Sequence, residues 1–150
     1  MELTCLPYEY FGLTECNRPP EVVVLSSGNA LPEAIDVTSG ELGTDCNSAG
    51  EALEGMLVTM RDVTLSSEAN LYGEVAIDDG SGQSQMNDAF FDVNAHLARE
   101  LADRSVQQLT GAKLTKLTGI VRFAYASFEI VPRDTDDLAL LGGDQDDDGI

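Results

Sequence analysis

The sequence predicts a mainly β protein: a closed five-stranded barrel with one short helix between its third and fourth strands, plus an N-terminal hairpin extension. Three observations predict it. The stretch that begins at Met56 is apolar on both faces, which requires a closed or covered sheet. The order along the chain is three strands, a helix and two strands. An apolar fraction of 43% in 150 residues is enough for the core of one ordinary domain.

Alternation and turn residues place each element. Residues 51–65 are expected to form one long strand, entered through Gly55, with successive side chains on opposite faces. The Asp-Asp-Gly-Ser-Gly segment at 78–82 is a strong turn signal. Asn94 is expected to cap a helix that runs to Asp103. The other four strands are expected at residues 71–77, 83–91, 113–126 and 128–132.

The first third of the chain is rich in turn-forming residues. A hairpin is expected over residues 8–16, turning near Gly12 and broken by Pro19 and Pro20, and a short buried strand over residues 21–25. The predicted division of the chain is a hairpin extension, a connector, a barrel domain and an acidic tail, at residues 1–28, 29–51, 52–138 and 139–150.

The charge is strongly acidic. Eight Lys and Arg stand against 27 Asp and Glu, for a net charge of −19. Binding of nucleic acid rests on Lys and Arg that displace counterions from phosphates, so this charge disfavours nucleic acid as a partner. It favours divalent cations. No apolar run has the length of a membrane span.

Alternate aspartates mark the C-terminus. Asp144, Asp146 and Asp148 followed by a glycine match the first half of a calcium loop, with the carbonyl of Ile150 as a further ligand. The predicted cofactor is therefore Ca²⁺. The alternative is an acidic tail without a bound ion.

Five short motifs, in order, resemble a known family. They are residues 50–59, 72–75, 78–82, 117–119 and 130–134. They look like the OB-fold module of large secreted bacterial proteins, a module that often accompanies extracellular nucleases of the endonuclease/exonuclease/phosphatase type. The resemblance implies an OB barrel and an extracellular or cell-surface location. The nuclease catalytic domain has no counterpart in the chain. The tail resembles the start of a thrombospondin type 3 repeat.

Three cysteines allow one disulfide and one remaining thiol. Given the secreted character that the resemblance implies, a disulfide is expected. The first choice of pairing joins Cys16 to Cys46, and the second joins Cys5 to Cys16. Three free thiols are the alternative.

Candidate catalytic residues are few. His96 is interpreted as a helix-surface histidine, and the pair Asp78 and Asp79 as a hairpin turn. The aromatic side chains are interpreted as core or hairpin cover rather than as base-stacking platforms, because basic residues do not interleave with them. They are Tyr8, Tyr10, Phe11, Phe123, Tyr125 and Phe128. We expect no enzymatic activity.

Two functions compete. The first is a calcium-binding, non-catalytic extracellular structural or interaction module. In this hypothesis the N-terminal strands dock on a neighbouring copy, and head-to-tail repetition gives a filament, because an isolated hairpin is marginally stable. The alternative packing folds the hairpin back on its own barrel. The second function is an accessory glycan- or nucleic-acid-binding OB domain of a secreted hydrolase.

Overall fold

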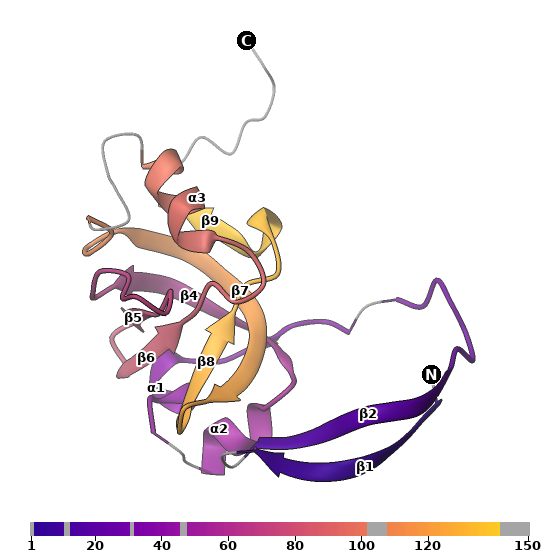
Figure 1. The fold of residues 1–150 in the computed structure, drawn as a ribbon. Coiled ribbons are helices and arrows are strands. Elements are labelled where there is room, and N and C mark those ends of the chain that lie inside the picture. The colour runs from indigo at the N-terminus through magenta and orange to yellow at the C-terminus, as the bar shows by residue number, and fades with distance from the viewer. Residues whose placement is uncertain (1, 11–12, 31, 46–47, 102–107, 142–150) are drawn as a thin grey trace.

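The computed structural model describes residues 2–10, 13–30, 32–45, 48–101 and 108–141 (Figure 1). Five strands form a closed barrel, with a separate two-stranded hairpin beside it. The barrel strands are β4 (Leu57–Leu65), β5 (Val75–Asp78), β6 (Gln83–Met86), β7 (Lys113–Ala124) and β8 (Ser127–Val131). The other elements are β1 (Glu2–Tyr10), β2 (Leu13–Val23), β3 (Ile35–Asp36), α1 (Ser39–Leu42), α2 (Ser48–Leu53), α3 (Val93–Glu100), a 3₁₀ turn at Thr135–Asp137 and β9 (Leu138–Leu140).

The strands close in the order β4, β5, β6, β8, β7 and back to β4. All contacts between barrel strands are antiparallel except that of β6 with β8, which is parallel at Met86 and Ile130. The closing ladder pairs Leu57 with Ile120 at one end and Thr64 with Lys113 at the other. This order, with α3 between the third and fourth barrel strands, is that of an OB-like barrel, so the predicted fold class is confirmed.

The core fills the barrel and continues under α3. Alternate residues of every barrel strand point inward and are fully or almost fully buried. On α3, Val93 and Leu97 are buried in the same cluster, and Leu101 packs against it, as the four-residue spacing of the two leucines predicts. The helix lies across one end of the barrel (Figure 1).

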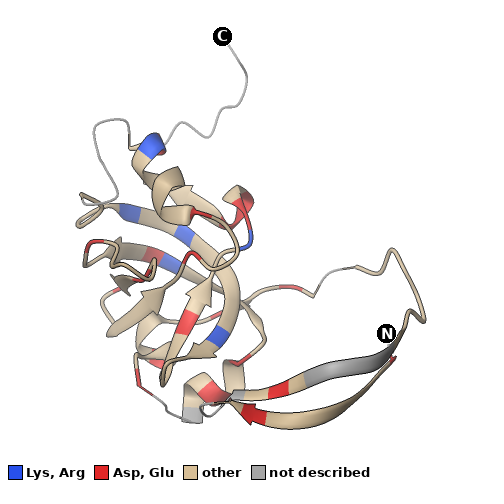
Figure 2. Cartoon of the chain, in the orientation of Figure 1, with Lys and Arg blue, Asp and Glu red and all other residues tan. Residues whose placement is uncertain are grey.

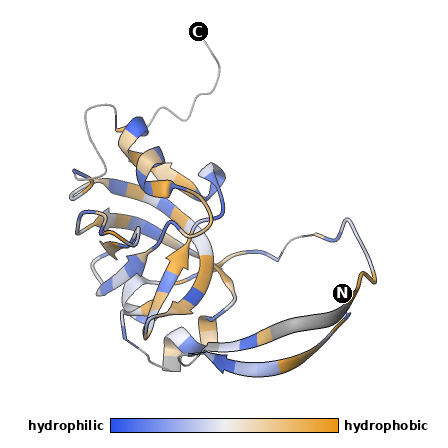
Figure 3. Ribbon diagram, viewed as in Figure 1, coloured by the Kyte–Doolittle hydropathy of each residue, from blue (hydrophilic) through white to orange (hydrophobic). Residues whose placement is uncertain are grey.

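The hairpin of β1 and β2 projects away from the barrel (Figure 1). Its register runs from Glu2 opposite Val23 to Tyr10 opposite Leu13, and the turn end lies beside α2. A disulfide joins Cys5 to Cys16 across it. Apolar side chains are exposed along its length. The ribbon of the hairpin carries orange, hydrophobic segments in Figure 3. They are Leu3, Leu6, Tyr8, Tyr10, Val22 and Val23, followed by Val24 and Leu25 beyond β2.

The central strand is shorter than predicted. Glu51 belongs to α2, and β4 begins only at Leu57, after Gly55 with φ 75°. The predicted alternation holds for Val58 and Met60 but then shifts by one residue, so that Val63 and Leu65 are buried. The shift follows Asp62, whose φ of 53° lies in the left-handed region and turns the strand face.

Several other boundaries also differ from the predictions. β2 runs through Pro19 and Pro20, with a register shift between Thr4 and Leu6 in place of a break. Residues 22–25, which were predicted to belong to a short buried strand, are exposed. Residues 29–51 contain β3, α1 and α2. Phe90 lies beyond the end of β6. Asp92, not Asn94, caps α3, since its carboxylate accepts from the backbone N–H of Ala95.

Candidate functional site

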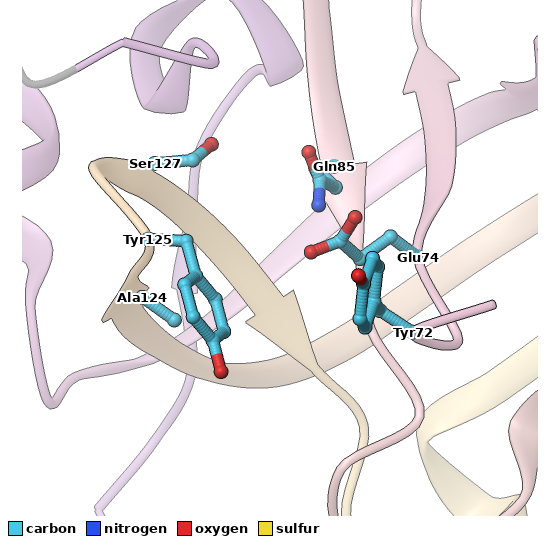
Figure 4. Close-up of a pocket in the computed structure, with 6 residues that line it drawn as sticks. All are labelled: Tyr72, Glu74, Gln85, Ala124, Tyr125 and Ser127. Carbon is cyan, nitrogen blue, oxygen red and sulfur yellow. The ribbon is translucent and has the colours of Figure 1, made fainter. Parts of the chain in front are cut away.

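All four tyrosines of the chain point outward, and two of them wall a cleft on the barrel (Figure 4). Tyr72 comes from the loop between β4 and β5 and is 73% exposed. Tyr125 comes from the β7–β8 turn and is 89% exposed. We call this space of about 460 Å³ the tyrosine cleft. Its lining residues are Tyr72, Glu74, Gln85, Ala124, Tyr125 and Ser127.

The β7–β8 turn holds Tyr125 away from the core. Ala124 pairs with Ser127, so the turn has two central residues, Tyr125 and Ala126, with φ of 50° and 66°. Two positive φ angles define the tight turn whose twist matches that of the flanking strands. Directly below it, Phe123 and Phe128 pack with their ring centroids 5.0 Å apart. The phenylalanines therefore fill the core, as predicted, and the tyrosine is left at the surface.

The opposite wall is a loop ordered by its own polar groups. The side-chain oxygen of Asn70 accepts from the backbone N–H of Tyr72 at 2.8 Å and from that of Glu74 at 3.1 Å. This asparagine turn fixes the backbone on both sides of Gly73, whose φ is 77°. Tyr72 is therefore in a structured loop, not in the strand predicted over residues 71–77.

Two more asparagines anchor the same loop to the barrel and to α3. Asn87 donates to the carbonyl of Tyr72 at 3.3 Å, and Asn94 donates to the carbonyl of Gly73 at 3.0 Å. The φ of Gly73, 77°, is one that L side chains rarely adopt, and a Cβ there would also displace the carboxylate of Asp88, so glycine is favoured here. The wall that carries Tyr72 is thus held in place before any ligand arrives.

The floor of the cleft is polar. Gln85 on β6 donates to Glu129 at 3.4 Å, and Arg122 on β7 donates to the other oxygen of that carboxylate at 2.6 Å. Burial raises the pKa of Glu129, and this outweighs the hydrogen bond from Arg122, while the nearby carboxylate of Glu74 adds to the rise. The cleft thus has carboxylate and amide groups between two aromatic walls.

This arrangement suits a ligand with many hydroxyl groups and no negative charge. Aromatic faces contact the apolar side of a sugar ring, and carboxylate and amide groups pair with its hydroxyls. Phosphate groups would meet the carboxylate of Glu74. Among the described residues, Lys and Arg are scattered over β4, β7, α3 and the segment after β8 (Figure 2). None of the residues that line the tyrosine cleft is a Lys or Arg.

Asp79 has a structural role. Its carboxylate accepts from the backbone N–H groups of Ser39 at 3.0 Å and Ser81 at 2.9 Å, and from both hydroxyls. These bonds tie α1 to the β5–β6 turn, which confirms the interpretation of Asp78 and Asp79 as a turn. Burial raises the pKa of Asp79, but the hydrogen bonds from Ser81 and Ser39 outweigh it and lower the pKa to about 2.

The predicted metal-binding residues lie outside the described part of the chain, and the first choice of disulfide pairing is not the one formed. Asp144, Asp146, Asp148 and Ile150 lie outside the described residues. Within the described ranges, no three His, Cys, Asp or Glu side chains form a metal-binding group. The pairing of Cys16 with Cys46 is wrong for this structure, because Cys16 is bonded to Cys5, its neighbour across the hairpin. Cys46 itself is not among the described residues.

His96 lies on α3, half-buried, with its ring centroid 6.3 Å from that of Phe91. His96 is therefore on the helix, as predicted, but its ring is half-buried beside Phe91 rather than fully on the helix surface. Of the aromatic residues interpreted as cover, Tyr8, Tyr10 and Tyr125 are exposed, and the cleft that Tyr125 walls was not predicted.

Comparison with protein-family models, with curated proteins and with solved structures gave no match. Within the part of the chain that the structure describes, no helix has the length and apolar character needed to cross a membrane.

We predict that Asp79→Asn lowers the free energy of unfolding at pH 7 by about 1–3 kcal/mol, because it removes an acceptor from the N–H groups of Ser39 and Ser81. The pKa of Asp79 falls on folding, so its contribution is present above the unfolded value of 3.8 and is lost as the pH falls to about 2. The difference in Tm between the wild type and the variant should therefore shrink over that interval. Circular dichroism melts at several pH values measure it.

The control is Asp78→Asn, since Asp78 accepts one backbone bond, from Gly80. It should lower Tm by less than Asp79→Asn does. Equal Tm losses for both variants, or a difference that stays constant from pH 5 to pH 2, would contradict the role given to Asp79.

Proposed function

We propose that this chain is a non-catalytic interaction module of an extracellular protein, and that it binds a neutral or amino-sugar oligosaccharide in the tyrosine cleft. The observation that carries the proposal is the pair of exposed tyrosines on two structured loops, with Glu74 and Gln85 between them (Figure 4). The Cys5–Cys16 disulfide supports an oxidising, extracellular location.

The shape and position of the cleft favour a saccharide. Its volume of about 460 Å³ falls within the range of small-ligand sites. It lies on the face of β5 and β6, between the first loop and the last turn of the barrel. OB-fold barrels bind oligosaccharides and oligonucleotides on this face.

Charge decides between those two ligand classes. A net charge of −19 repels a phosphate backbone, and the residues that line the cleft include Glu74 but no Lys or Arg. Non-specific binding of nucleic acid comes mainly from Lys and Arg contacts to phosphates. A sugar with hydroxyl, acetamido or ammonium groups meets no such repulsion, and an ammonium group would be attracted.

We predict that a glycan array retains the chain on at least one neutral or amino-sugar oligosaccharide, and that Tyr72→Ala and Tyr125→Ala each weaken this binding about tenfold, the size of one aromatic contact. Leu71→Ala is the matched control. Leu71 precedes Tyr72 and is 99% exposed, but it does not line the cleft. Retention only on DNA or on acidic glycans, or unchanged retention of both tyrosine variants, would refute the proposal.

Self-assembly is a second candidate, favoured by the open end of the hairpin. Leu3, Val22, Val23, Val24 and Leu25 are all exposed there, far from the tyrosine cleft. We propose that a second copy of the chain covers this end by strand addition, which repeats head to tail. Two copies of charge −19 repel each other, so the contact requires cations, and the aspartates of the tail are the proposed Ca²⁺ ligands.

We predict that sedimentation velocity shows assemblies in calcium that dissociate with a chelator. Val22→Ser combined with Val24→Ser should abolish them, because both changes remove apolar area at the open end. Asp144→Asn combined with Asp146→Asn should abolish both the assemblies and any rise in Tm caused by calcium. Leu71→Ser, at an exposed apolar position outside the hairpin, should change neither. A wild-type monomer in saturating calcium would rule out self-assembly.

A further inference from the structure

A second cleft lies where the turn end of the hairpin meets the β7–β8 turn. Its volume is about 600 Å³, larger than that of the tyrosine cleft. Tyr10 and Glu15 line it from the hairpin, and Arg122 and Tyr125 line it from the barrel. We call this space the hairpin cleft.

The two clefts share a wall. Tyr125 and its neighbour Ala124 line both of them. Tyr125, at the tip of the turn, therefore lies between the two clefts. It is 89% exposed, so a ligand in either cleft can contact it. Three of the four tyrosines, Tyr72, Tyr125 and Tyr10, thus line two adjoining clefts.

A chain of polar side chains links the two clefts. Gln85 lines the tyrosine cleft, Arg122 lines the hairpin cleft, and both donate to Glu129. Glu129 is fully buried, so it holds the two donors in fixed positions. The same carboxylate, that of Glu129, therefore orients a hydrogen-bonding side chain in each cleft: Gln85 in the tyrosine cleft and Arg122 in the hairpin cleft.

The hairpin presents Tyr10 from a defined position. Tyr10 pairs with Leu13 immediately before the turn, and the Cys5–Cys16 disulfide cross-links the two strands further along. The turn end also borders a second hollow of the barrel, which Thr14 lines together with Glu51 and Glu54. The hairpin therefore lies against the barrel at this end, although its open end projects away (Figure 1).

We propose that the hairpin cleft is a second subsite for the same saccharide, with Tyr10 as its platform, so that the ligand is an oligosaccharide long enough to pass over Tyr125 rather than a single sugar. This inference rests on the function proposed above. In this proposal the hairpin determines how long an oligosaccharide the module prefers to bind. Glu15 lines this subsite as Glu74 lines the first. Arg122 also lines it but is paired with Glu129, so the lining of neither subsite offers an unpaired cation to an anionic sugar.

The other ligand that aromatic grooves commonly bind is a proline-rich peptide. The mixture of carboxylate, amide and hydroxyl groups along the floor of the tyrosine cleft favours a ligand with hydroxyls on every unit. A peptide of this type is therefore included in the experiment as the competing outcome.

The test is calorimetric titration of the full chain with N-acetylglucosamine oligomers and with cello-oligosaccharides, each from the monosaccharide to the hexasaccharide. A proline-rich peptide is titrated in parallel. We expect the affinity of the wild type to rise with length until the oligomer spans both subsites and then to level off. Tyr10→Ala should remove that rise, weakening the longest oligomer about tenfold while leaving the shortest bound oligomer unchanged.

Tyr8→Ala is the matched control, because Tyr8 lies on the same hairpin face, opposite Glu15, but does not line the cleft. It should bind like the wild type. Binding that is independent of length, or a Tyr10→Ala variant that matches the wild type at every length, would overturn the second subsite and leave the first intact. No binding at any length in either series, or binding of a proline-rich peptide alone, would overturn the proposed function and the second subsite with it.

Discussion

Closure of the barrel by the ladder between β4 and β7 is the constraint on which the rest of the structure depends. β4 pairs with β7 from Leu57 to Thr64, and β7 then continues to pair with β8. Since all five strands are paired on both sides, the barrel has no free edge of its own. Closure also fixes where the loops emerge, so the loop after β4 and the turn after β7 face each other across β5 and β6.

The two walls of the tyrosine cleft are held by different means. The turn that carries Tyr125 is rigid because two residues with positive φ close it over a packed pair of phenylalanines. The loop that carries Tyr72 is rigid because three asparagines satisfy its backbone groups. Because both loops are already ordered, they lose little conformational entropy when a ligand binds, and this is how preorganised sites gain affinity.

The hairpin differs from the barrel in what stabilises it. Two strands alone bury little apolar area, and the described side chains of β1 and β2 are mostly exposed. A disulfide across an 11-residue separation contributes about 2–3 kcal/mol by restricting the unfolded chain. The cross-link therefore replaces the core that the hairpin lacks and keeps Tyr10 in position at the barrel.

The strand order, the helix and the barrel could be predicted because they depend on alternation, on caps and on turn residues near one another in sequence. Which side chains of β4 after Asp62 are buried could not be predicted, because no turn residue beside Asp62 indicates its left-handed backbone conformation. The tyrosine cleft was missed because the apolar run at residues 71–77 was assigned to a strand. Asn70, two residues before Tyr72 and followed by Gly73, was the available turn signal. The disulfide pairing depends on strand register, which spacing alone does not determine.

The four tyrosines of the chain allow binding in the tyrosine cleft to be tested directly by NMR. Ring resonances of a chain labelled with ¹³C-tyrosine, assigned with single Tyr→Phe variants, are followed during titration with chitohexaose and cellohexaose. We expect the signals of Tyr72 and Tyr125 to shift together and to saturate at one affinity, while that of Tyr8 stays in place. Unmoved signals of Tyr72 and Tyr125 with both hexasaccharides, or a shift of Tyr8 without them, would contradict it.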